Sequence, residues 1–365
     1  MPAEVYFTDL RGKSGLNLLD KVERLFERAG FASLINPKDL VAVKVHFGER
    51  GNTAFVRPQY LRRIVDKIKQ AGGKPFLTDA NTLYVGSRAN AVEHIETAIE
   101  NGFAYATVGA PVIIADGLTG RDYVSVPVDL KHFHAAKVAA AAYHADVLIA
   151  VSHFKGHETT GFGGVLKNLG MGLASRASKQ VIHSDVLPEV DGEKCVACGR
   201  CTEWCPAEAI TVEEVAVIDP EKCLGCAECT ITCNQDAIAV NWKGEPDVIQ
   251  EKIVEYACAV LKNKKGKAGF ITFVVDVTPQ CDCTNYNDIP VVPDVGILAS
   301  RDPVALDQAC VDLVNAQPST PGSRLDLPAG ADKFRGLYPK IDWEVQLDYA
   351  EKIGLGTRKY RLIEI

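Results

Sequence analysis

Apolar residues along this chain follow two periodicities, one typical of buried strands and one typical of amphipathic helices. The stretches Leu40–Val45 and Ala145–Val151 are almost continuously apolar, as strands buried on both faces are. Between them, Pro58 begins an amphipathic stretch that ends at a glycine pair, as a helix with proline at its first position would. This strand–helix–strand order predicts an α/β fold with a mainly parallel sheet flanked by helices.

Further segments extend the pattern on both sides. Strands are expected at Glu4–Phe7, Pro75–Thr78, Gly269–Asp276, Val295–Ala299 and Tyr360–Ile365, with a β-rich region over 111–128. Helices are expected at Leu18–Ala29, Pro58–Gln70, Ser87–Asn101, His134–Tyr143, Pro246–Leu261, Pro303 to about Val314, and Trp343–Ile353. Neither half forms a self-contained set of elements. We therefore predict one α/β domain built from residues 1–187 and 246–365, with residues 188–245 inserted in an exposed loop.

The predicted insertion carries two runs of cysteines, CVACGRCTEWC and CLGCAECTITC. Each has the spacing C-x2-C-x2-C-x3-C found in bacterial two-cluster ferredoxins, where the fourth cysteine of each run ligates the other cluster. Residues 188–245 are therefore expected to form a small α+β ferredoxin-like unit with two [4Fe-4S] clusters. The expected ligands are Cys195, Cys198, Cys201 and Cys233 for one cluster, and Cys223, Cys226, Cys229 and Cys205 for the other.

A zinc site and a disulfide framework are the alternatives for these cysteines. Zinc sites use two well-separated pairs of ligands, so two four-cysteine runs fit them poorly. The N-terminal residues contain no apolar signal region, and no stretch is long and apolar enough to span a membrane. We therefore expect a cytoplasmic, reducing location, where disulfides are rare.

Composition is that of a soluble protein with a sizeable core. The 365 residues are 47% hydrophobic and 24% charged, and the formal net charge is −7. No run of lysine or arginine stands out, which argues against nucleic acid as the main partner. A redox partner protein is expected instead.

Polar and reactive side chains follow three of the expected strands. The stretch KVHFGERG places Lys44 and His46 on one side, because side chains alternate along a strand. The stretch SHFKGH alternates in the same way and leads to a glycine-rich turn. The third stretch holds Cys281 and Cys283, which can face the same way but are too close in sequence for an easy disulfide. Because ligands bind beyond the carboxyl ends of α/β strands, we expect all three stretches to line one pocket.

Individual roles in this pocket are assigned as hypotheses. Candidate catalytic residues are His46, His153, Lys155, His157 and Lys167, and candidate cofactor-binding residues are Lys44, Gly163, Gly164 and Asn168. The ordinary interpretation of a histidine or lysine at a strand end is a solvated or hydrogen-bonded residue. Two kinds of ligand stay open. A metal could use Cys281, Cys283 and one of the histidines, and an anionic small molecule could use the lysines and the backbone N–H groups of the glycine-rich turn. No G-x-G-x-x-G follows a first strand, so no tightly bound nicotinamide or flavin is expected.

These stretches are also where the chain resembles a known family. KVHFGERG at 44–51, SHFKGHETTGFGGVLKNLGMG at 152–172, CDC at 281–283 and the ferredoxin-like unit between them resemble the domain of unknown function 362 family, often labelled iron-sulfur centre proteins. The resemblance covers nearly the whole chain. It implies the inserted-ferredoxin arrangement and the same pocket residues, and it implies no particular substrate.

Two functional hypotheses follow. In the first, the two clusters carry single electrons between an external protein and a metal or small-molecule site in the α/β domain, which would make the protein an oxidoreductase. In the second, the protein is a non-catalytic electron carrier or a docking subunit of a larger redox complex. A third hypothesis gives the clusters a structural or sensing role.

Overall fold

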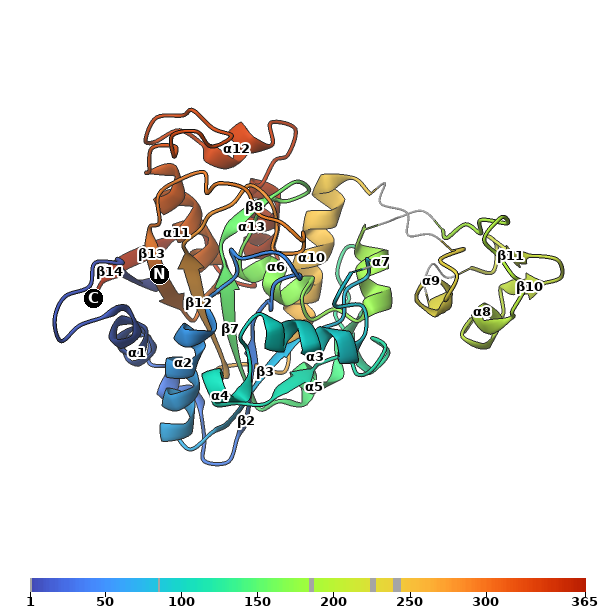
Figure 1. Ribbon diagram of the computed structural model, residues 1–365, viewed down its shortest axis with the longest axis horizontal. Coiled ribbons are helices and arrows are strands. Elements are labelled where there is room, and N and C mark those ends of the chain that lie inside the picture. Colours follow the sequence, from blue (N-terminus) through green and yellow to red (C-terminus); the bar gives the residue numbers. More distant parts are fainter. Residues whose placement is uncertain (1, 85, 184–186, 224–227, 239–243) are drawn as a thin grey trace.

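The computed structural model describes residues 2–84, 86–183, 187–223, 228–238 and 244–365. Its centre is an eight-stranded sheet (Figure 1). From one edge to the other, the strands are β14 (Tyr360–Glu364), β1 (Ala3–Thr8), β13 (Gly296–Ser300), β12 (Ala268–Val274), β7 (Val147–His153), β2 (Leu40–Lys44), β3 (Lys74–Asp79) and β4 (Val112–Ile114).

The sheet is mixed but mainly parallel, as the sequence predicts. β13 pairs antiparallel with both β12 and β1. All other neighbours in the sheet pair in parallel. The carboxyl ends of β3, β2, β7 and β12 therefore meet at one edge, which is where ligands bind in α/β sheets.

Six helices lie close to positions expected from the sequence, whereas those at 31–34, 105–108, 165–170, 176–183 and 333–337 were not predicted. Helices flank this sheet. They are α1 (Leu18–Arg28), η1 (Phe31–Leu34), α2 (Pro58–Gln70), α3 (Ala91–Glu100), α4 (Tyr105–Val108), α5 (Ala140–His144), α6 (Val165–Gly170), α7 (Arg176–His183), α10 (Pro246–Leu261), α11 (Pro303–Asn315), α12 (Lys333–Leu337) and α13 (Glu344–Lys352). Local caps fix several of their starts. The Asn17 side chain accepts the N–H groups of Leu19 and Asp20 before α1, and Asp302 caps α11 in the same way. No helix among the described residues is long and apolar enough to cross a membrane.

Two apolar cores cover the two faces of the sheet. Within β2, Val41 and Val43 contribute to one core and Ala42 to the other, as alternation along a strand requires. The Val41 core packs under α1 and α2, and the Ala42 core packs under α6, α10 and α11. Burial on both faces explains why these strands read as continuous apolar runs.

Two helix predictions need correction. Most of His134–Tyr143 is not helix: Ala135–Ala139 forms β6, which pairs antiparallel with β5 (Tyr123–Pro127), and only α5 follows. Hairpin pairing with β5 outweighs the helix propensity of alanine here. The predicted helix Ser87–Asn101 begins at Ala91, because the Asn90 side chain caps it by accepting two backbone N–H groups.

Residues 188–223 and 228–238 form a small separate unit at one end of the molecule (Figure 1). It contains α8 (Arg200–Glu203), α9 (Glu228–Thr232) and the antiparallel pair β10 (Ile210–Val212) and β11 (Ala216–Ile218). Its own core buries Cys201, Ile210, Ala216, Cys229 and Ile238. Cys226, one of the predicted cluster ligands, lies outside the described residues. The domain boundaries predicted from sequence remain a prediction.

Candidate functional site

A pocket of about 580 Å³ lies beyond the carboxyl ends of β2 and β3. Its walls come from these strand ends, from the hairpin β8 (Lys155–His157) and β9 (Gly161–Gly163), from α6 and α7, and from the loop after β12. Of the residues predicted outside the cysteine runs, it is lined by Lys44, His46, Lys155, His157, Gly163, Gly164, Lys167, Asn168, Cys281 and Cys283. The three stretches thus meet in one pocket, and of these predicted residues only His153 is not among the lining side chains.

His153 instead holds the cysteine-bearing loop in place. Its Nδ1 lies 2.8 Å from Asp282 Oδ1, and its Nε2 lies 2.8 Å from the Val275 carbonyl oxygen. Asp282 is fully buried and also pairs with Lys155, whose Nζ lies 3.1 Å from Oδ2. Since both ring nitrogens face oxygen atoms, His153 has none left for a metal or a substrate. Its anchoring of Asp282 leaves the cysteines on either side facing the pocket.

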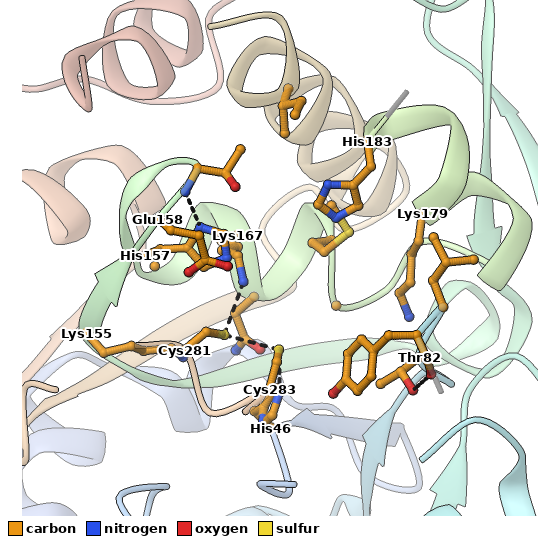
Figure 2. Close-up of a pocket in the computed structure, with 18 of the residues that line it drawn as sticks. His46, Thr82, Lys155, His157, Glu158, Lys167, Lys179, His183, Cys281 and Cys283 are labelled. Carbon is orange, nitrogen blue, oxygen red and sulfur yellow. Dashed lines mark hydrogen bonds between the residues drawn. The ribbon is translucent and has the colours of Figure 1, made fainter. Parts of the chain in front are cut away.

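The two cysteines form the centre of a chain of contacts across the pocket (Figure 2). Their Sγ atoms are 3.1 Å apart and share a hydrogen bond. Lys167 Nζ lies 3.4 Å from Cys281 Sγ, and His46 Nε2 lies 3.4 Å from Cys283 Sγ. The hydrogen bond from Cys283 and the ammonium of Lys167 hold the pKa of Cys281 well below its ordinary value, although burial opposes this. Cys281 is therefore the more acidic thiol of the pair, since the pKa of Cys283 is raised.

Two of the histidines that line the pocket, His46 and His157, each use Nδ1 as a hydrogen-bond acceptor and keep Nε2 as a donor. His46 Nδ1 accepts the Gly48 N–H at 3.0 Å, and His157 Nδ1 accepts the N–H groups of Thr159 and Thr160. Burial holds the pKa of both rings well below the ordinary value, so both are neutral and carry their proton on Nε2. A histidine that ligates a metal shows the opposite pattern, because its second nitrogen donates to an oxygen.

This pattern favours the anion interpretation of the pocket over the metal one. Among the described residues, no group of three or more His, Cys, Asp or Glu side chains converges on a point where one metal ion could sit. His46 contacts Cys283, and Cys283 contacts Cys281, but these contacts form a row. The metal site at these cysteines stays a prediction, and the ring geometry does not support it.

Lys44 and Asn168 line the pocket, but their polar atoms already bond to each other and to neighbouring protein groups. Lys44 Nζ lies 2.9 Å from Asp79 Oδ1 and donates to Asn168 Oδ1 at 2.7 Å. The Asn168 amide also donates to the Val151 carbonyl oxygen and to Ser152 Oγ. Burial opposes the charge of Asp79, but Lys44 and neighbouring cationic groups hold its pKa below the ordinary value. These residues therefore build the wall of the pocket.

The glycine-rich turn does not offer its helix-opening N–H groups to a ligand, contrary to the sequence hypothesis. Asp307, on α11, accepts the N–H groups of Val165 and Leu166 at 2.7 and 2.9 Å. A Cβ at Gly164 would lie 2.2 Å from Asp307 Oδ1, so glycine is needed for this close approach. A Cβ at Gly163 would press against Lys167, at 3.3 Å from its Cδ. The glycines provide space for Asp307 and Lys167, and the anion-binding donors must be side chains.

Two buried lysines supply positive charge without a carboxylate partner. Within the described residues, neither Lys167 nor Lys179 has an acidic oxygen at ion-pair distance. Lys179 Nζ donates to the carbonyl oxygens of Asn81 and Ala80, at 2.6 and 3.3 Å. Burial lowers the pKa of Lys179 to about 8, so the amine is mostly protonated at neutral pH. Lys179 Nζ contacts only carbonyl oxygens and Lys167 Nζ faces a cysteine sulfur, so an anionic ligand in the pocket would gain charge-assisted hydrogen bonds from either ammonium.

Several pocket residues were missed by sequence reasoning. Asp79 and Arg88 are both buried, and their side chains lie 3.4 Å apart. Arg88 also contacts Glu49 and Tyr84. The strand-end rule could have found Asp79, which ends β3 next to Lys44 of β2. Arg88 and Lys179 carry no such signal, because only the folded chain brings their loop and helix to the strand ends.

In the cysteine-rich unit, four cysteines line one small cavity. They are Cys195, Cys198, Cys201 and Cys233, and the rest of the wall includes apolar Val212, Ala216 and Ile238 and polar Arg200 and Gln235. Burial raises the pKa of Cys201, and the sulfurs of Cys198, Cys233 and Cys195 raise it further. The Ala216 N–H donates to Cys195 Sγ, and the Ala209 N–H donates to Cys205 Sγ, both at 3.3 Å. Three cysteines of one run and Cys233 of the other thus lie around one space, and this is the ligand set predicted for one cluster.

The cysteine-rich unit leaves the α/β domain beside the pocket. His183 and Gly244, which flank the unit in sequence, both line the pocket, and the Gly244 N–H donates to the His183 carbonyl oxygen at 3.2 Å. The unit also contacts the β5–β6 hairpin region. The Arg121 guanidinium lies 3.7 Å from the centre of the Trp204 ring, and Lys137 Nζ lies 3.1 Å from Glu228 Oε1.

Comparisons with other proteins identify a family and two distant structural likenesses. The model of a family described as domain of unknown function (DUF362) matches residues 41–312. No curated protein matches the chain. The lactate racemase apoprotein from Thermoanaerobacterium thermosaccharolyticum is 14% identical at a TM-score of 0.42, over 87% of this chain and 59% of its own. A Thermotoga maritima protein of known structure is 14% identical at a TM-score of 0.38, over 78% and 56%. The chain thus spans less than two thirds of either.

Proposed function

The chain belongs to the DUF362 family, whose description names no activity, and from this premise we propose that it is an iron-sulfur redox protein. Two [4Fe-4S] clusters in residues 188–245 would carry single electrons between a partner protein and a small anionic molecule in the α/β pocket. The observation that carries the proposal is the cavity lined by Cys195, Cys198, Cys201 and Cys233. Three of these come from one run and the fourth from the other, which is the ligand exchange of two-cluster ferredoxins.

The pocket supports an enzyme in preference to a simple carrier. Its volume of about 580 Å³ is typical of small-molecule sites, and a carrier needs no such site. The two residues that flank the cysteine-rich unit line this pocket, so electrons from the unit would enter the α/β domain beside it. When bound, the clusters supply one-electron transfer at potentials set by burial and N–H···S bonds.

The side chains of the pocket define the class of molecule that would bind. Lys167 and Lys179 are buried cations without carboxylate partners among the described residues, and neutral His157 keeps a donor on Nε2. Lys155, which pairs with Asp282, also lines the pocket. A carboxylate, phosphate or sulfate group would find charge-assisted hydrogen bonds here.

Metal analysis of protein purified without oxygen tests the clusters. We expect about eight iron and about eight sulfide per chain, with the electron paramagnetic resonance signals of two reduced cubanes. The double variant C281S/C283S should keep this iron content, because these cysteines are assigned to the pocket. Zinc at the eight cysteines, or an iron-free chain, contradicts the proposal, and loss of a cubane in the double variant contradicts the ligand assignment.

A further inference from the structure

Cys281 and Cys283 lie in a tight turn that brings their sulfurs together. The Thr284 N–H donates to the Cys281 carbonyl oxygen at 3.1 Å, and the Glu49 N–H donates to the Asp282 carbonyl oxygen at 3.0 Å. In an extended chain the side chains of residues two apart lie too far from each other for their sulfurs to touch, and the turn brings them together. The Sγ atoms are 3.1 Å apart, so a disulfide would need an approach of about 1 Å. Both thiols are free and line the pocket.

The surroundings of the pair are charged and polar, although Cys281 itself is buried. Lys167 faces Cys281, and the neutral His46 ring faces Cys283 through Nε2. Reactive cysteines sit in positively charged, partly accessible sites, whereas structural cysteines are enclosed in apolar surroundings. Cys310 on α11 illustrates the second kind, since it is fully buried in the apolar core.

We propose that Cys281 and Cys283 form a redox-active pair that switches between a disulfide and a dithiol inside the pocket. Reduction breaks the Cys281–Cys283 bond and takes up two electrons and one proton, giving a Cys281 thiolate beside the Lys167 ammonium and a Cys283 thiol. This step deepens the proposed function and rests on it, because a one-electron donor would supply the two electrons one at a time, and the cysteines of residues 188–245 would hold the [4Fe-4S] clusters that supply one-electron chemistry. The pair would store two electrons for a bound anionic substrate that accepts them together.

Equilibration with thiol buffers tests the pair itself. Full-length protein purified without oxygen is held in mixtures of reduced and oxidised dithiothreitol. It is then denatured in the presence of iodoacetamide, which alkylates free thiols, and digested. In oxidising mixtures, mass spectrometry should show the peptide that contains residues 281–283 without alkylation and lighter by two hydrogens than its dithiol form. The oxidised fraction should follow a two-electron dependence, about 30 mV per tenfold change in the ratio of disulfide to dithiol. The Cys310 peptide should be alkylated in every mixture. If Cys281 and Cys283 are alkylated throughout, the pair is not redox-active and the inference is wrong.

The variant Lys167→Met tests the role assigned to the lysine. Loss of the ammonium lowers the thiolate fraction of Cys281, so cross-linking by oxidised dithiothreitol at pH 7 should slow by about tenfold. Lys340→Met, which changes an exposed lysine, is the matched control and should react at the wild-type rate. An unchanged rate in Lys167→Met overturns the placement of the thiolate.

Reduced methyl viologen tests the link to the clusters. The cross-linked full-length protein should become reduced at 281–283, and a Cys198→Ala variant, which lacks one cluster ligand, should react much more slowly. If the wild-type pair stays oxidised while its clusters are reduced, the proposed electron transfer from the clusters to the pair is wrong, but the presence of the clusters is confirmed. If no cluster is present at all, the proposed function fails, while the thiol-buffer experiment still decides whether the pair is redox-active.

Discussion

The cysteine-rich unit and the α/β pocket both bring sulfur atoms together, but different forces hold them there. The unit's own core buries five residues, two of which are cysteines. A core of this size supplies little hydrophobic free energy, so metal binding would have to hold the unit together. The pocket rests on two large cores, one on each face of an eight-stranded sheet.

The polar contacts of the two regions differ as well. Those around the pocket are buried ion pairs and hydrogen bonds between distant parts of the chain, such as Lys44–Asp79 and His153–Asp282. Those within the unit are local, such as Lys194–Asp191, with both side chains exposed to solvent. We therefore expect the fold of the unit to depend on bound metal and the structure of the pocket to depend on its buried charges.

Removing a cluster ligand should have the largest effect, and it should be confined to the unit. We expect Cys201→Ser to lose the cluster at Cys195, Cys198, Cys201 and Cys233 and to unfold residues 188–238, because the remaining core is too small. Limited proteolysis and iron analysis without oxygen measure this. Cys258→Ser, in α10, should keep its iron. If the unit resists proteases without iron, its fold does not depend on the metal.

Breaking the Lys44–Asp79 pair should destabilise the α/β domain. Asp79→Leu leaves Lys44 and Arg88 buried without this carboxylate, which should lower the free energy of unfolding by about 3 kcal/mol or more. Denaturant unfolding measures the change. The double variant K44M/D79L should recover part of the loss, since one of the stranded charges is removed. Equal loss in both variants would mean that the pair is not the source of the effect.

Anion binding in the pocket should weaken as the pH rises through about 8. The pKa of Lys179 is about 8, so the lysine is a cation below this pH and neutral above it, whereas sulfate keeps its charge. Sulfate affinity, measured by calorimetry, should fall by up to about tenfold per pH unit above 8. Lys179→Gln should remove this dependence.

Lys264 provides the matched control for this titration. Burial lowers its pKa to about 8 as well, but its Nζ donates to the carbonyl oxygens of Tyr143 and Ala145, outside the pocket. Lys264→Gln should therefore keep the wild-type pH dependence of sulfate binding. The same loss in both variants would contradict the assignment of Lys179 to the site.

The smallest effect is expected where the two regions touch. Arg121→Gln removes the contact with the Trp204 ring and the interaction with Glu228, and should cost about 1 kcal/mol or less. Hydrogen exchange at α9 should rise slightly, while iron content and sulfate binding stay unchanged. Loss of iron in this variant would show that the unit depends on the α/β domain for its fold.

The sequence by itself specified the elements whose causes are local. Apolar runs predicted the strands, and the helices expected from Leu18 and Pro303 begin there because the side chains of Asn17 and Asp302 cap their first N–H groups. The same reasoning failed at 134–143, where alanine favours a helix and the partner strand β5 decides the outcome. Ten of the residues that the strand-end rule grouped also line one pocket, because parallel strands end at one edge.

Only the tertiary structure decided what those pocket residues can do. Asp307, over 140 positions from the glycine-rich turn, accepts hydrogen bonds from the N–H groups that were expected to bind an anion. Asp79 and Asn168 occupy Lys44, and backbone N–H groups set the proton positions on His46 and His157. A residue type fixes which hydrogen bonds a side chain can make, but its neighbours in space decide which of them are already used.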